Sequence, residues 1–331
     1  MDTTSVDSGY LTAALTALDS FPVEPESVEL VAHSENVTYR VAVRGSDNDY
    51  SLRLHRPGYN SIEQLESERA WTRALSTAGI AVPESLPTHQ GKHYVLVDIP
   101  GADEQRYAGM TTWFEGQTLR DYLDSPTGAG ERVLLFGRIG ELAAALHNQA
   151  TSWDEPPGFT LQRLDLDGLL GKAPFWGRFW EHENVTAAEE KLLRKVRERF
   201  RDALSAYGVR RDNFSVIHAD LHPDNIVYDG NDLALIDFDD AAYGWHMYDI
   251  ASALIDDSSA PDLPAISNAL LDSYQKHRPL ADRDIDMLRT FLLIRGMAII
   301  GWFHQRPEHE ETAYFDEIKQ WVVAECESNE W

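Results

Sequence analysis

The segment HADLHPDN, residues 218–225, determines how this chain can be interpreted. It lies between two short runs of β-branched and aromatic residues, Phe214–His218 and Ile226–Tyr228. Such runs predict strands, so most of the segment is expected to be the loop that joins them. A further predicted strand, Leu233–Asp237, ends in an aspartate. The pattern therefore predicts a strand–loop–hairpin unit that carries two carboxylates and an amide at fixed places.

These residue types match the requirements of phosphoryl transfer. The reaction needs a carboxylate that orients and deprotonates an attacking hydroxyl, and oxygen ligands for the magnesium that bridges the phosphates. Asp220 is the candidate base, while Asn225 and Asp237 supply a neutral and an anionic oxygen. An Asp, an Asn five residues later and the Asp of an Asp-Phe pair form the arrangement of protein kinases.

Other readings remain open for single residues. Asp220 and Asn225 are each also typical of turns, and Asp237 could simply end a strand. His218, Asp220 and His222 alternate along the chain, so on a strand they would face one way, as transition-metal ligands do. Pro223 and the loop character of the region weaken that reading, which also leaves the first half of the chain unexplained.

The first half reads as a small sheet with a helix. Ser61–Ala78 has apolar residues at helical spacing, and Leu11–Leu18 shows the same spacing. Short β-branched and aromatic runs between turn-forming residues predict the strands, which are Val28–His33, Val37–Val43, Tyr50–His55, His93–Val97 and Ala108–Phe114.

After Gly116 the pattern is mainly helical. The predicted helices include Leu119–Leu123, Arg132–Asn148 and Ala187–Tyr207, and helices resume from His246. The chain is thus expected to be an α+β bilobal molecule: a small antiparallel sheet with one helix, residues 1–115, then a larger mainly helical lobe, residues 116–331.

Composition excludes several classes of partner. The formal net charge of -26 repels nucleic-acid phosphates and anionic lipid, so neither is expected as a partner. The single cysteine, Cys326, cannot form an internal disulfide, and the N-terminus has no secretory signal pattern. The apolar run Thr290–Phe303 is interrupted by Arg295 and reads as a buried helix. A cytoplasmic protein is therefore expected, and its oligomeric state is not predicted.

The residues resemble a known superfamily. The segment 218–225, with Ile236–Asp239 and Tyr248–Ala251, looks like the aminoglycoside phosphotransferase and choline kinase superfamily, whose members have a protein-kinase-like fold. In the first half, Ser51–Tyr59 and Glu66–Trp71 resemble the subgroup of type II homoserine kinases and the bacterial stress-response Ser/Thr kinase. The resemblance covers roughly residues 28–305.

The resemblance implies ATP and Mg²⁺ as cofactors and assigns roles to the motif. Asp220 would be the catalytic base, and Asn225 and Asp237 the magnesium ligands. His218 would brace the catalytic loop, and His222 stands where protein kinases have a lysine, so it would touch the transferred phosphate. Asp249 would accept hydrogen bonds from amides of the catalytic loop, or else be an ordinary acid early in a helix.

The nucleotide side departs from the family in two places. The phosphate-covering loop corresponds to Ser34–Tyr39 and contains no glycine, so the side chains of Ser34, Asn36 and Thr38 would do part of its work, unless it is a plain polar turn. Arg53 replaces the lysine of the third strand.

Two further expectations concern the nucleotide. Glu68 is the expected partner of Arg53, with Glu66 as the alternative. The adenine would be read by backbone groups around Thr111 and Trp113.

The acceptor is expected to be a small hydroxyl compound that carries an amine, because acidic and aromatic side chains suit a cation. These aromatics are also typical of a core. A Ser/Thr protein kinase and a catalytically silent nucleotide-binding regulator stay open as alternatives. The acids near the expected rim are Asp239, Asp240, Asp256, Asp257, Glu181 and Glu183, and the aromatics are Phe175, Trp176, Trp180, Tyr243, Trp245, Trp302 and Tyr314.

Overall fold

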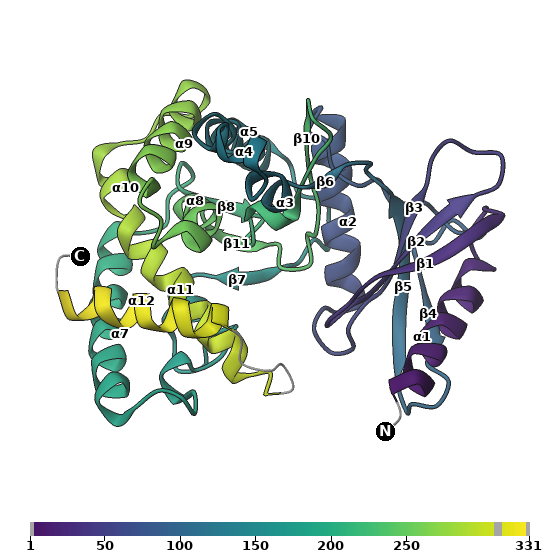
Figure 1. Cartoon of the computed structure of the whole chain (residues 1–331), viewed down its shortest axis with the longest axis horizontal. Helices are drawn as coiled ribbons and strands as arrows, with labels where there is room; N and C mark the ends of the chain where they lie inside the picture. Colours follow the sequence, from purple (N-terminus) through teal and green to yellow (C-terminus); the bar gives the residue numbers. More distant parts are fainter. Residues whose placement is uncertain (1–2, 308–312, 329–331) are drawn as a thin grey trace. The chain divides into compact units, whose positions relative to one another are not determined.

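The computed structural model describes residues 3–307 and 313–328, which form two compact units (Figure 1). The first unit comprises Met1–Gln117, Asp154–Thr160 and Val227–Asp239. The second comprises the rest of the chain. The first change of unit thus falls two residues after the predicted boundary, and two later segments belong to the first unit, which a single boundary cannot represent.

The first unit is built on an antiparallel sheet of order β1-β2-β3-β5-β4. Two helices accompany it, α1 (Thr3–Leu18) and α2 (Ile62–Thr77). The predicted strands and both helical segments are confirmed, with ends shifted by a few residues. The strands are β1 (Pro25–His33), β2 (Val37–Val43), β3 (Tyr50–Leu54), β4 (Tyr94–Asp98) and β5 (Gln105–Thr112).

Strand alternation positions the polar face of this sheet. On β2, Val37, Tyr39 and Val41 are buried in a core to which α1 contributes Ala13, Ala14 and Ala17. The residues between them point the other way. Thr38 is one of these, and it pairs across the sheet with Arg53 of β3. The guanidinium of Arg53 therefore extends from the face opposite this apolar core.

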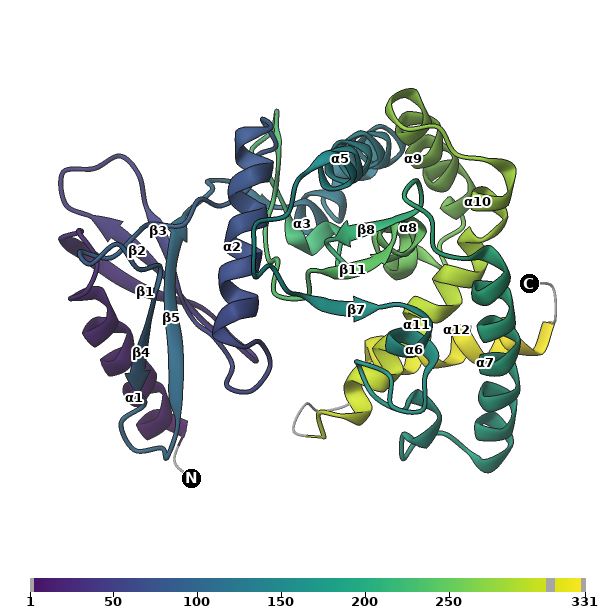
Figure 2. The same cartoon turned by 180° about the vertical axis from the view of Figure 1, so that it is seen from behind.

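The second unit is mainly helical around a three-stranded sheet of order β7-β11-β8. Figure 2 shows β8 and β11 beside α8, which packs against both strands. Its strands are β7 (Gln162–Leu164), β8 (Phe214–Ile217) and β11 (Ala242–Trp245), and its α-helices are α3 (Leu119–Leu123), α4 (Pro126–Ala129), α5 (Arg132–Ser152), α6 (Leu166–Leu170), α7 (Ala187–Tyr207), α8 (His246–Leu254), α9 (Leu263–His277), α10 (Asp282–Asp286), α11 (Leu288–His304) and α12 (Ala313–Ser328). Short 3-10 turns lie at η1 (Phe179–Glu181), η2 (Pro223–Asn225) and η3 (Ile255–Asp257).

Two strands of this sheet were not predicted from the sequence. β7 is only three residues long, and β11 contains Gly244 between aromatic residues. The glycine is needed there, because a Cβ atom would lie 2.4 Å from the side chain of Ile217 on β8. The remaining small sheet, β10-β9-β6, consists of β6 (Gln117–Thr118), β9 (Ile226–Tyr228) and β10 (Leu233–Leu235). β10 ends before Asp237, which the sequence had placed at the strand end.

Helix packing fixes the frame of the second unit. Gly140 lets α5 approach α9 closely, since a Cβ atom there would lie 2.1 Å from the Leu270 carbonyl oxygen. α11 packs against α8 and α12 and is buried along most of its length. Within residues 3–307 and 313–328, none of the helices combines the length and apolar character that crossing a bilayer requires.

Candidate functional site

The segment 218–225, which the sequence predicts to be a catalytic loop, follows β8 in the second unit and is held by a buried carboxylate. Asp249, near the start of α8, accepts hydrogen bonds from the amides of His218 (3.0 Å) and Ala219 (2.7 Å). Ala219 has φ 69°, in the left-handed region that costs a residue with a Cβ about 1 kcal/mol or more. The carboxylate therefore holds the backbone in a turn that it would not adopt unaided, and it does so in the way expected from the sequence.

A neutral histidine, His147, is hydrogen-bonded to Asp249. Burial lowers the pKa of His147 well below its usual value, so the ring is uncharged. Its Nδ1 lies 2.9 Å from the Tyr274 hydroxyl and its Nε2 lies 3.1 Å from Asp249 Oδ2. Since the carboxylate can only accept, Nε2 carries the hydrogen and Nδ1 accepts from Tyr274. Burial also raises the pKa of Asp249 to about 6, against the hydrogen bonds that favour its charged form.

Both oxygens of Asp220 are occupied by donors. Oδ1 accepts from Nη2 of Arg295 on α11. Oδ2 lies 2.9 Å from Nδ2 of Asn225 and 3.2 Å from Nε2 of His222. Burial would raise the pKa of Asp220, but the charges of His222 and Arg295 outweigh it and hold that pKa well below the usual range. The carboxylate is thus ionised and fixed in orientation, as a base that aligns a hydroxyl must be.

His222 is a cation in this setting. Its Nε2 faces Asp220, and its Nδ1 lies 3.0 Å from Oδ2 of Asp224. Burial opposes the charge, but the two carboxylates raise the pKa of His222 to about 10. The ring is therefore an imidazolium at neutral pH and carries the positive charge that the family resemblance implies for this position.

The first unit holds a second cluster of charges. Nη1 of Arg53 lies 2.8 Å from Oδ1 of Asp237 and 3.0 Å from Oδ1 of Asp239. Asp239 also accepts from Asn36 Nδ2 and lies 3.6 Å from His55. Burial would raise the pKa of Asp239, and Arg53 and then His55 lower it far below its usual value. Asp237 is the more accessible of the pair, with 38% of its side chain exposed against 12% for Asp239.

Glu68, the expected partner of Arg53, is placed differently. Arg53 donates to the two aspartates, and Glu68 Oε2 is buried with no hydrogen-bond partner among the described residues. Burial, and after it the charge of Asp239, raise the pKa of Glu68 well above its usual value. The alternative partner, Glu66, pairs with Arg69 at 2.7 Å.

The glycine-free loop between β1 and β2 is held by side chains. The amide group of Asn36 donates to Asp239, and its oxygen accepts from the Arg56 amide at 2.8 Å. Glu35 forms an ion pair with Arg56, and the Glu35 carbonyl accepts from Arg106. Ser34 is exposed and closes the turn through its amide.

At the predicted adenine position, some strand amides already have partners. The Trp113 amide donates to the Asp49 carbonyl at 3.0 Å, and the Thr112 amide donates to the Glu84 carbonyl at 2.9 Å. Thr111 pairs with Ser51 of β3. Adenine recognition near Thr111 and Trp113 stays a prediction.

Sequence reasoning missed Arg295, which donates a hydrogen bond to Asp220, the expected base. Arg295 was noticed only as an interruption of an apolar run, although a charge in the middle of a buried helix is itself a signal. Its guanidinium lies 5.7 Å from the ring centre of Trp176, which stacks on Tyr248 at 5.9 Å. His147 was missed as well, and no local pattern marks it.

Most of the acids expected at the acceptor rim are already paired. Asp257 lies 2.9 Å from Arg132 and 3.4 Å from Arg120, and Asp256 accepts from the Tyr314 hydroxyl at 2.8 Å. Glu181 pairs with arginines of its own neighbourhood. These carboxylates are therefore largely neutralised by the protein.

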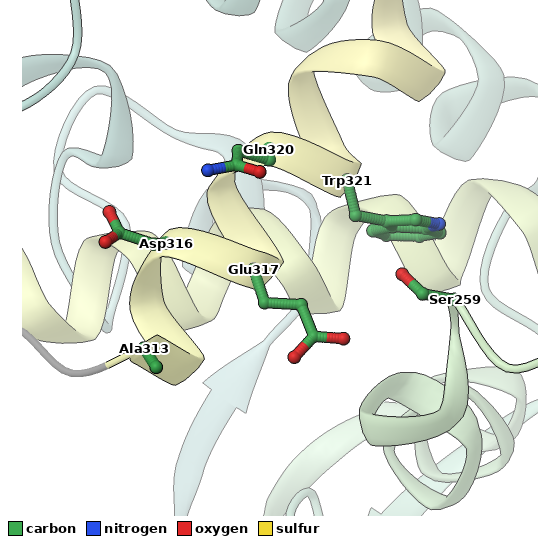
Figure 3. Close-up of a pocket in the computed structure, with 6 residues that line it drawn as sticks. All are labelled: Ser259, Ala313, Asp316, Glu317, Gln320 and Trp321. Atoms are coloured by element: carbon green, nitrogen blue, oxygen red, sulfur yellow. The ribbon is translucent and has the colours of Figure 1, made fainter.

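A pocket of about 470 Å³ in the second unit has free acids instead. Figure 3 shows its lining, with Asp316, Glu317 and Trp321 from α12 and Ser259 from the segment after η3. Neither Asp316 nor Glu317 forms an ion pair with any residue that the structure describes. Tyr314, one turn earlier on the same helix, reaches Asp256.

Comparison with known proteins identifies the family. Residues 27–284 match the phosphotransferase enzyme family. The chain belongs to this family. The phosphotransferase is 24% identical to amicoumacin kinase of Bacillus subtilis (strain 168) over 298 residues, 85% of this chain and 80% of that protein. It is 33% identical to homoserine kinase of Chelativorans sp. (strain BNC1) over 232 residues, 68% of this chain and 63% of that protein.

Solved structures agree with this assignment. The phosphotransferase resembles a microcompartment-associated aminopropanol kinase with a TM-score of 0.81 and 29% identity, over 96% of this chain and 95% of that one. The amicoumacin kinase hAmiN, solved with AMP-PNP, Ca²⁺ and Ami, shares the fold with a TM-score of 0.77 and 19% identity, over 98% and 96% of the two chains. The resemblance drawn from the sequence is confirmed, and the protein is a kinase or phosphotransferase that uses an alcohol group as acceptor.

Proposed function

We propose that this phosphotransferase moves the γ-phosphate of ATP to the hydroxyl of a small, amine-bearing acceptor, such as an amino alcohol, amino sugar or amino acid. The observation that carries the proposal is Asp220. It is ionised, its carboxylate is fixed by Asn225 and His222, and its loop is held by Asp249. A hydroxyl placed against it would be oriented and would give up its proton to this carboxylate as the phosphoryl group arrives.

The remaining residues of the candidate site would contact the metal and the phosphate oxygens. Asn225 and Asp237 would hold magnesium, which would neutralise phosphate oxygens when bound. The donor set suits that ion, because it consists of an amide oxygen and an accessible carboxylate. The Asn225 amide nitrogen donates to Asp220, which leaves its oxygen directed to the other side. His222 would place its positive charge near the transferred phosphate, and Arg53 would grip phosphate oxygens of the nucleotide.

Support for an amine on the acceptor comes from α12. Asp316 and Glu317 line a pocket with Trp321, and a carboxylate beside an aromatic face suits an ammonium group. Relatives named for aminopropanol and homoserine act on acceptors of this kind.

The test is a panel of acceptors with labelled ATP and Mg²⁺. It contains amino alcohols, amino sugars, hydroxy amino acids, amine-free alcohols and Ser/Thr peptides, and each is run on the native protein and on Asp220→Asn. We expect transfer to amine-bearing small molecules that is lost in the variant. Transfer to peptides alone would contradict the proposal, and so would nucleotide binding without transfer to any acceptor.

A further inference from the structure

Arg295 carries a charge within a buried, apolar stretch of α11, where an ion is unfavourable. From Phe291 to Phe303 it is the only charged residue of α11, and its side chain is 11% exposed. A buried guanidinium is tolerated only when it is paired, because removing an ion from water costs several kcal/mol. Its ion-pair partner is the catalytic carboxylate itself, Asp220.

This pairing partly covers the base. Oδ2 of Asp220 accepts from Asn225 and His222, which uses both of its lone pairs, and Oδ1 accepts from Arg295, which leaves one lone pair beside the guanidinium. A hydroxyl that reaches this carboxylate must therefore bind next to Arg295, and withdrawal of one donor would free an oxygen for it. Asn225 and His222 belong to the same loop as Asp220, and Asn225 is further tied to the Asp220 carbonyl at 2.9 Å. Arg295 comes from another helix on a long side chain, so it is the donor that can withdraw.

The geometry of the guanidinium indicates what would replace Asp220. Nε and Nη2 lie along one edge of the planar group and together match the two oxygens of a carboxylate. Asp220 uses Nη2, whereas Nε is buried and has no hydrogen-bond partner among the described residues. One edge of Arg295 is therefore only half used. Trp176 and Tyr248, which lie beside it, carry no negative charge to compensate it.

We infer that Arg295 binds a carboxylate of the acceptor and thereby uncovers Asp220. The inference rests on the proposed function and narrows it to hydroxy acids, above all hydroxy amino acids. Since Arg295 and Asp220 are in direct contact, the carboxylate and the reacting hydroxyl must be separated by only a few bonds. An acceptor without a carboxylate would leave Arg295 on the base.

The same edge of Arg295 could instead receive an oxygen of the transferred phosphate. The two sources differ in one respect, because a phosphate contact would serve every acceptor equally. Matched acceptors that differ only by a carboxylate therefore separate them. Suitable pairs are homoserine against aminopropanol, serine against ethanolamine, and hydroxybutyrate against propanol.

The experiment measures kcat and KM for these pairs in the native protein, Arg295→Gln, Arg295→Lys and the control Arg289→Gln. Arg289 lies on the same helix but pairs with Glu325. We expect the native protein to favour each carboxylate-bearing member. Arg295→Gln should raise KM for those members by about 10- to 100-fold, in line with the loss of charge-assisted hydrogen bonds. For carboxylate-free acceptors kcat should rise in Arg295→Gln, because no guanidinium then covers Asp220 in their presence. Arg295→Lys should recover part of the preference, and Arg289→Gln should resemble the native protein.

An equal loss of kcat for both members of each pair would overturn the inference, and so would a native preference for carboxylate-free acceptors. Calorimetric binding of homoserine and hydroxybutyrate without nucleotide gives a second readout. If no acceptor is phosphorylated, the proposed function fails, and binding that depends on Arg295 still decides the role of this residue. Thermal unfolding of each variant shows whether it is folded.

Discussion

The two units of this phosphotransferase each pair one arginine with a functional aspartate, and the two pairs have opposite charge surroundings. In the first unit Arg53 faces two aspartates, Asp237 and Asp239. In the second unit the single carboxylate of Asp220 faces two cations, Arg295 and His222. Arg53 thus contacts two carboxylates, whereas Asp220 contacts two cations, one of which, His222, is shared with Asp224.

This difference indicates what each cluster lacks. The second carboxylate beside Arg53 suits a divalent cation, and the second cation beside Asp220 suits an anionic group of a substrate. An Arg–Asp ion pair therefore suits the binding of a cation in the first unit and of an anion in the second unit. Substitutions that change the charge of a side chain but keep its size can test this contrast between the surroundings of Arg53 and Asp220.

The largest effect is expected for Asp220→Asn. The amide keeps the size of the side chain but cannot accept the hydroxyl proton, so kcat should fall by about 10³-fold or more, with ATP affinity little changed. Asp224→Asn is the matched control, because Asp224 contacts the other nitrogen of the same His222. Steady-state kinetics and nucleotide titration measure both variants. Equal losses in the two would mean that Asp220 acts only by fixing the histidine.

Asp237→Asn should act next most strongly, through the metal. Loss of an anionic ligand should raise the Mg²⁺ concentration for half-maximal activity by at least about tenfold, since even outer partners of a metal change affinity by about 10- to 100-fold. The measurement is a Mg²⁺ titration at saturating ATP. Asp232→Asn, at an exposed position after β9, is the control. An unchanged Mg²⁺ requirement would remove Asp237 from the ligand set.

Asp249→Asn should lower the stability of the second unit. An amide offers one acceptor oxygen, whereas the carboxylate accepts hydrogen bonds from two backbone amides. We expect a loss of about 1–3 kcal/mol in the free energy of unfolding and a lower kcat, as Ala219 leaves its left-handed conformation. Urea unfolding and kinetics measure the two effects. A variant with native stability and activity would show that Asp249 is an ordinary helix residue.

Asp249 also predicts a pH dependence. Its pKa in the folded protein, about 6, lies above the value of about 3.9 for an unfolded aspartate. The folded state therefore binds more protons between these values, and this contribution to stability is lost as the pH rises through about 6. Unfolding free energies at acidic and neutral pH should show this loss in the native protein and not in Asp249→Asn. An identical pH dependence in both would contradict the raised pKa.

The smallest effect is expected for Glu68→Gln. Burial raises the pKa of Glu68 well above its usual value and so favours the neutral carboxyl, and its replacement by a neutral amide should change stability by less than about 1 kcal/mol. If Glu68 pairs with Arg53 once nucleotide and metal draw Asp237 away, ATP affinity should still fall. Calorimetry of ATP binding with Mg²⁺ would detect this, and unchanged affinity would exclude the pair.

Contacts within one short segment were predictable from the residue types, whereas contacts between distant segments were predictable only where the family resemblance supplied them. The motif from His218 to Asn225 is local, and its loop chemistry follows from the residue types. The brace by Asp249 followed from the family resemblance, and the structure has it as expected. Arg295 lies far along the chain from Asp220, and the sequence marks it only as a charge within an apolar helix.

Some differences between the sequence-based predictions and the structure have local physical causes. Arg53 was expected to pair with Glu68, but it donates to the two aspartates that follow β10 instead, while burial favours the protonated form of Glu68. β7 and β11 are too short to show an alternating pattern, and their pairing depends on distant segments, since β7 pairs with β11 and β11 also pairs with β8. Sequence periodicity does not contain that information.

The hydrogen bonds of the Asn36 side chain hold the loop between β1 and β2, and this affects how a nucleotide would bind. A glycine-rich loop samples many conformations when empty and loses that freedom when phosphates bind, which makes the entropy of binding unfavourable. Here Asn36 already joins the loop to Asp239 and to the end of β3 before any ligand arrives. Much of the ordering is thus completed when the chain folds, and nucleotide binding should show a smaller entropic penalty than in relatives whose loops depend on glycine.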